Sequence, residues 1–132
     1  MDKALLKKLT ILYTLSIFLV SIIPIPKLPF PEFVLFEWDK FFHLCAYLIM
    51  TITWICLGFL ETSRFRWNYV KIVIFVAIIT EFFQGVLPIG RYFEIADIIA
   101  NMTGILIGIF LVKALFLKIS SHSFYFKKKK LF

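Results

Sequence analysis

Five side chains capable of acid, base or hydrogen-bonding chemistry lie within residues 80–104 of a chain that is 61% hydrophobic. An ionisable group at the centre of a lipid-spanning helix costs on the order of 3 kcal/mol, so such groups normally face other helices and mark functional sites. The acid at position 81 is the most informative, because it falls inside an apolar run. The five residues are Glu81, Gln84, Arg91, Asp97 and Asn101.

A second polar group occupies residues 39–47. Asp39, His43 and Tyr47 are spaced four residues apart, and residues at this spacing lie on one face of a helix. The stripe reaches about 12 Å along the helix axis, at about 1.5 Å per residue. Lys40 stands beside it in the sequence.

The later residues follow the same helical spacing. Glu81 and Gln84 are three residues apart, and Asp97 and Asn101 are four apart, so each pair shares a helix face. Three segments therefore present polar groups that a helix bundle could bring together.

An imidazole beside carboxylates and a guanidinium is suited to general acid/base chemistry. We expect three catalytic candidates: His43 as general acid or base, Glu81 as a second acid/base group, and Asp97 as a group that orients His43, a role that Asp39 could also take. These three are also plausible zinc or manganese ligands, but no short-range metal motif is present, so the sequence predicts neither a metal nor a cofactor. The expected ligand-binding residues are Asp39, Lys40, Tyr47, Gln84, Arg91 and Asn101.

Simpler roles stay open for some of these residues. Asn101 and Gln84 can serve as interhelical hydrogen-bonding groups, each worth about 1–2 kcal/mol in model peptides. Asp97 can act as a favourable acid at a helix N-terminus.

The elements that must position these groups are apolar segments. A mean hydropathy of +0.93 and 17 Phe in 132 residues are too apolar for a soluble domain of this size. The first apolar run is followed by proline-rich sequence and not by a small-residue cleavage site, so we expect a retained span. The sequence predicts an all-α membrane bundle of four transmembrane helices in a single domain, with spans at about 5–23, 41–60, 70–87 and 98–117 and a basic tail at 118–132.

Basic residues flank these spans unevenly. Twelve of the 15 Lys and Arg residues fall on one set of flanks, and only Lys27, Lys40 and Arg91 fall on the other. The positive-inside rule then places both termini of this multi-pass protein in the cytoplasm. The net charge of +7 is thereby explained by topology, so no nucleic-acid partner is predicted. With this orientation the polar groups converge in the outer half of the bilayer.

Small residues repeat every four positions in the last span, at Ala100, Gly104 and Gly108. Such a stripe lets helix backbones approach closely. Its partner is either another span of this chain or a second protomer, so a homo-oligomer is possible.

The ordered set of polar residues resembles the VanZ-like family of small bacterial membrane proteins. The resemblance lies in two stretches, "DKFFHLCAYLIM" and "EFFQGVLPIGRYFEIADIIANMTGILIG", and covers about half the chain. The family takes its name from a protein linked to resistance to teicoplanin, a lipoglycopeptide that acts on cell-wall precursors outside the membrane. The resemblance implies a bacterial cytoplasmic (inner) membrane and an extracytoplasmic site, and it leaves substrate and reaction open.

Three functions follow as hypotheses. The leading one is an outward-facing pocket that engages an envelope headgroup or a lipopeptide at the outer leaflet, with membrane lipids as further partners. The second is an acid/base enzyme, a transferase or hydrolase, acting on a lipid-linked substrate. The third is a transporter subunit, which is disfavoured because the inner halves of the spans lack matching polar groups.

Overall fold

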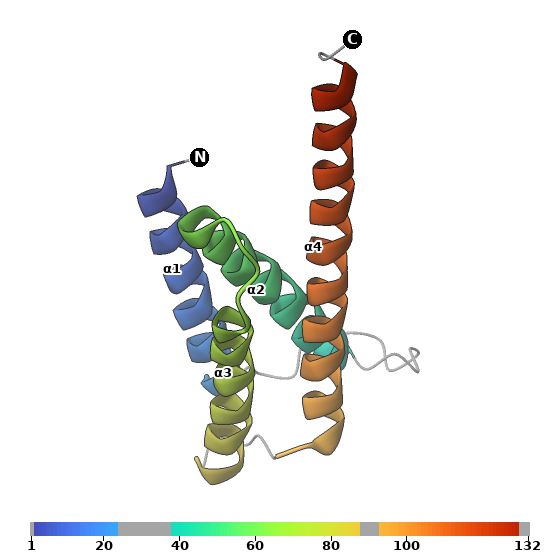
Figure 1. Ribbon diagram of the computed structural model, residues 1–132. Coiled ribbons are helices and arrows are strands. Elements are labelled where there is room, and N and C mark those ends of the chain that lie inside the picture. The colour runs from blue at the N-terminus through green and yellow to red at the C-terminus, as the bar shows by residue number, and fades with distance from the viewer. Residues whose placement is uncertain (1, 24–37, 88–92, 130–132) are drawn as a thin grey trace.

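A computed structural model describes residues 2–23, 38–87 and 93–129, with side chains described as far as residue 116. Within these ranges the protein is entirely helical, as the sequence predicts. The four helices are α1 (Lys3–Ile22), α2 (Trp38–Thr62), α3 (Trp67–Val86) and α4 (Ile95–Lys129) (Figure 1). Each contains a segment long and apolar enough to cross a membrane, and in α4 this segment is Ile95–Phe116.

The helices differ from the predicted spans mainly at their ends. α2 begins at Trp38, three residues before its predicted span, and α4 begins at Ile95 and continues to Lys129. Polar and aromatic residues at a membrane boundary are compatible with helix, so hydropathy locates the apolar segment and not the helix ends. The basic residues expected in a tail thus lie largely on the continuation of α4.

Proline marks the ends of α1 and α3. Ile23 and Leu87 follow these helices in extended conformation, with φ/ψ of −81°/132° and −77°/139°. Each precedes a proline in the sequence, and proline disfavours helical geometry in the residue before it. At the opposite end of α1, the side chain of Asp2 accepts a hydrogen bond from the Ala4 amide at 3.3 Å.

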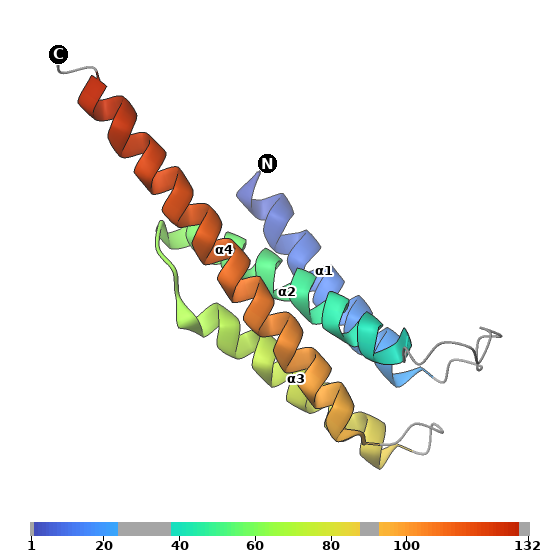
Figure 2. The same ribbon diagram turned by 90° about the vertical axis from the view of Figure 1, so that its right-hand side faces the viewer.

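The stripe of small residues packs α4 against α2 of the same chain. A Cβ added at Gly104 would collide with the backbone carbonyl of Leu44 and lie 3.0 Å from the Leu48 amide nitrogen. A Cβ at Gly108 would lie 2.8 Å from the Cβ of Thr51. The absence of side chains lets the two backbones approach closely where α4 crosses α2 (Figure 2).

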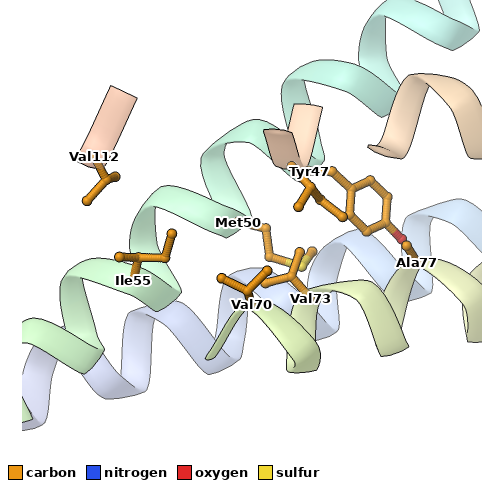
Figure 3. Close-up of a cluster of buried hydrophobic side chains, with 8 residues drawn as sticks. Tyr47, Met50, Ile55, Val70, Val73, Ala77 and Val112 are labelled. Carbon is orange, nitrogen blue, oxygen red and sulfur yellow. The ribbon is translucent and has the colours of Figure 1, made fainter. Parts of the chain in front are cut away.

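An apolar core fills the middle of the bundle, whereas many large apolar side chains face outward. Phe75 is 64% exposed and Phe110 is 71% exposed, as expected for surfaces that contact lipid. The core joins α2, α3 and α4 (Figure 3), and its labelled members are Tyr47, Met50, Ile55, Val70, Val73, Ala77 and Val112.

The alternating directions of the helices gather the polar residues at one end. α1 and α3 finish at this end, and α2 and α4 begin there (Figure 1). α1 packs against α2 and α3, whereas α4 packs against α2 and α3 on the other side. The end of the bundle therefore receives side chains from all four helices.

Candidate functional site

A buried chain of hydrogen bonds connects three helices. The Nδ1 of His43 on α2 lies 3.1 Å from Oδ1 of Asn101 on α4, and Nδ2 of Asn101 donates to Oε1 of Glu81 on α3 at 3.1 Å. His43, Asn101 and Glu81 are 6%, 0% and 1% exposed, respectively. The sequence predicts that these residues converge, and the structure brings them together.

This chain also sets the tautomer of the imidazole. Asn101 directs its NH₂ group at Glu81, so its carbonyl oxygen faces His43 and accepts a hydrogen bond. In the neutral imidazole the proton is therefore on Nδ1, and Nε2 keeps its lone pair. The Nε2 atom lies 4.0 Å from Oδ1 of Asp39, one helical turn earlier on α2.

An ion-pair group forms the rim of the site. The ammonium of Lys40 lies 2.6 Å from Oε2 of Glu94 and 3.5 Å from Oδ1 of Asp97. The side chains of Lys40 and Glu94 are 23% and 49% exposed, whereas that of Asp97 is only 6% exposed. The polar groups thus run from an exposed rim to the fully buried Glu81.

Tyr47 lies deeper than the rim residues. Its hydroxyl donates to Oγ1 of Thr80 on α3 at 3.2 Å, and Thr80 in turn donates to the carbonyl oxygen of Val76 at 2.8 Å. Tyr47 is fully buried and belongs to the apolar core. The structure therefore places this predicted binding residue beneath the polar group, where it links α2 to α3.

Gln84 is directed toward α1. Its Nε2 donates to the backbone carbonyl of Ser21 at 2.9 Å. Its Oε1 is buried and accepts no hydrogen bond from the described residues. Gln84 thus connects the last turns of α1 and α3, at the edge of the site.

Asp39, His43 and Asp97 form a compact group of potential metal ligands. One ligand atom of each lies within 4.8 Å of the others. From the sequence, the plausible metal ligands are His43, Glu81 and Asp97. In the structure, Asp39 takes the place of Glu81 in this group. The structure directs a Glu81 oxygen to Asn101, whereas Asp39 faces the Nε2 of the imidazole.

Three residues that contribute to the site are not predicted from the sequence: Glu94, Thr80 and Ser21. Glu94 precedes α4, and its carbonyl oxygen accepts from the Asp97 amide at 3.1 Å while its carboxylate binds Lys40. Thr80 supplies a hydroxyl that accepts from Tyr47, and Ser21 supplies a backbone carbonyl that accepts from Gln84. Glu94 could have been found from its position three residues before Asp97; the other two carry no such signal. Arg91, a predicted binding residue, lies outside the described residues.

The charge of the chain is divided between the two ends of the bundle. Among the described residues, four acids lie at the polar end, Asp39, Glu81, Glu94 and Asp97, together with one basic residue, Lys40. The described part of the polar end is therefore acidic. Such an end favours a cation or a ligand that carries an amine, alongside any group bound by Lys40.

Comparison with protein families gives one finding. The model of the VanZ/LLP1 family matches residues 6–117, a range that includes every residue of the described polar group. No curated protein and no solved structure matches the chain.

Proposed function

The chain belongs to the VanZ/LLP1 family, and we propose that it is a membrane protein whose polar end binds a headgroup of the cell envelope or a lipopeptide. The observation that carries the proposal is the buried connection from His43 through Asn101 to Glu81. Three apolar helices place these costly groups at one depth and orient them by hydrogen bonds, which is typical of a functional site within a membrane.

The orientation of the site is part of the proposal. Basic residues concentrate at the end opposite the polar group, where α1 begins and α2 ends. The positive-inside rule supports cytoplasmic termini and a polar group near the outer leaflet of a bacterial cytoplasmic membrane. A ligand in that leaflet would reach the site at its exposed rim.

The rim suggests how a ligand would be held. The ammonium of Lys40 can meet a phosphate or carboxylate, and Arg91 is available in the adjoining sequence for bidentate binding. Asp39 and Asp97 can accept hydrogen bonds from amines, amides or hydroxyls. A headgroup that combines an anionic group with an amine therefore fits best, and teicoplanin-like lipopeptides are among the candidates.

An enzymatic role is favoured by one separate observation. The Nδ1 of His43 is engaged by Asn101, so Nε2 is presented as a base toward Asp39. A base positioned in this way could remove a proton from a lipid-linked substrate or a water molecule. A transport role is less supported, because the apolar core around Met50, Ile55 and Val73 lies between the polar group and the opposite end.

Native mass spectrometry of the purified protein tests headgroup binding. We expect the wild-type chain to retain a polar envelope lipid or added teicoplanin, and Glu81→Gln and His43→Gln to lose it. Glu61→Gln is the matched control: Glu61 is also a membrane-helix acid, but it accepts a hydrogen bond from Tyr69 at the opposite end of the bundle. Equal retention by all four proteins would rule the site out.

Lipid extracts from the expressing cells distinguish binding from catalysis. A lipid species that changes in wild-type cells and not in His43→Gln cells would indicate an enzyme. An unchanged lipid profile, with ligand retained only by the wild type and the Glu61→Gln control, would indicate a binding protein. Teicoplanin susceptibility of the same strains then shows which outcome accompanies resistance.

A further inference from the structure

The three clustered residues at the polar end have the composition of a metal site. Asp39 and His43 come from successive turns of α2, and Asp97 comes from the first turn of α4. Ligands at this i, i+4 spacing share a helix face, as in helical zinc motifs. We propose that Asp39, His43 and Asp97 bind one divalent ion of the Zn²⁺ or Mn²⁺ class.

The imidazole is arranged as metal-binding histidines usually are. A ligating histidine typically donates its second ring N–H to an oxygen acceptor, which fixes the ring and leaves the other nitrogen for the metal. Asn101 accepts from Nδ1 of His43 at 3.1 Å and is itself held by Glu81. The buried pair of Asn101 and Glu81 thus orients Nε2 of His43 toward the carboxylates.

The distances need little adjustment for coordination. Zinc ligands lie about 2.0–2.2 Å from the ion, so two neighbouring ligand atoms are about 3–4 Å apart. Nε2 of His43 and Oδ1 of Asp39 are already 4.0 Å apart. The side chain of Asp39 is 48% exposed, and it can move inward toward the buried His43 and Asp97.

Lys40 is the cation that competes with a metal ion for Asp97, and its contacts allow it to release this carboxylate. Its ammonium is closer to Glu94, at 2.6 Å, than to Asp97, at 3.5 Å. When an ion takes Asp97, Lys40 keeps its shorter contact with Glu94. Because the described residues of the polar end comprise four acids and one base, a divalent ion also reduces its net negative charge.

Three protein ligands leave coordination positions for water or for a ligand oxygen. A phosphate or carboxylate of a headgroup could occupy such a position. This second step rests on the proposed function, whereas binding of the ion alone does not.

Manganese titration of the full-length protein in detergent tests the site without added lipid. Electron paramagnetic resonance reports free Mn²⁺, and its pulsed form reports a coordinated nitrogen. We expect one bound ion per chain, with nitrogen coupling that His43→Gln abolishes. Asp39→Asn and Asp97→Asn should each weaken binding by about tenfold or more, and Asn101→Ala by about tenfold through loss of imidazole orientation.

Glu61→Gln is the matched control, because Glu61 is a membrane-helix acid at the opposite end of the bundle, where it accepts a hydrogen bond from Tyr69. It should keep wild-type affinity. Wild-type binding no stronger than that of the Asp39→Asn/Asp97→Asn double variant would overturn the proposal, as would an equal loss in Glu61→Gln. If Asp97→Asn does not fold, the test relies on Asp39→Asn, because the side chain of Asp39 is partly exposed.

The same preparations separate the metal site from the headgroup proposal. Retention of lipid or teicoplanin is measured with the ion bound and after chelation. Specific ion binding without any retained headgroup would refute the proposed function and leave the metal site standing. If the headgroup is retained and the ion does not bind specifically, the metal site is refuted and the proposed function stands.

Discussion

Asn101 donates a hydrogen bond from Nδ2 to Oε1 of Glu81 at 3.1 Å, joining α4 to α3 where both residues are fully buried. Replacing Asn101 by Ala removes one hydrogen-bonding partner of the buried Glu81 carboxylate and one of His43. We expect a loss of about 1–3 kcal/mol in stability, measured by reversible unfolding in detergent. Thr103→Ala on the same helix, at a partly exposed position, should change stability by less than about 0.5 kcal/mol. Equal effects of the two substitutions would contradict the buried role.

Gly104 should tolerate no side chain. Alanine at this position would force its Cβ against the Leu44 carbonyl and separate α2 from α4. Overpacking of this kind costs about 1–3 kcal/mol, which a lowered Tm in detergent would reveal. Ala114→Val adds more volume at an exposed position of α4 and serves as the control. Unchanged thermal stability of Gly104→Ala would show that the close approach is not needed.

The Tyr47 hydroxyl is expected to contribute to stability and not to ligand binding. Tyr47→Phe keeps the ring in the core and removes its 3.2 Å hydrogen bond to Thr80. We expect a cost of about 1 kcal/mol in unfolding free energy and unchanged retention of the headgroup in native mass spectrometry. A stable variant that no longer retains the ligand would place the hydroxyl in the site instead.

The ion pair between Lys40 and Glu94 at the rim should have a small coupling energy. Lys40 and Glu94 are 2.6 Å apart, yet both side chains are partly exposed. A double-mutant cycle with Lys40→Gln and Glu94→Gln should therefore give a coupling of about 0.2–1 kcal/mol, and less at high salt. A coupling that is several times larger and insensitive to salt would mean that the pair is shielded from solvent.

Cysteine labelling tests the orientation in intact cells. With Cys45 and Cys56 replaced by Ser, a cysteine at Glu94 should react with a membrane-impermeant maleimide from outside. A cysteine at Ser63, an exposed position between α2 and α3, should react only after the cells are permeabilised. The opposite pattern would place the polar end in the cytoplasm.

Much of this arrangement was predictable because the helix period and the cost of charge in lipid are strong constraints. The spacing of Asp39 and His43 and that of Asp97 and Asn101 predict shared faces, and alternating spans bring these faces to one end. Which atoms meet depends on helix rotation and rotamers, which spacing does not determine. Sequence reasoning therefore placed Glu81 and not Asp39 in the candidate metal group, and it could not show that Tyr47 lies in the core.

α4 extends as one helix from Ile95 to Lys129, past the end of its apolar segment at Phe116. A helix of 35 residues is about 52 Å long. If it pivots as a rigid rod near Asp97, a tilt of about 5° displaces its far end by about 4–5 Å, by the same geometry. By this geometry, a small change of tilt at the polar end becomes a displacement of several ångströms at the opposite end of α4.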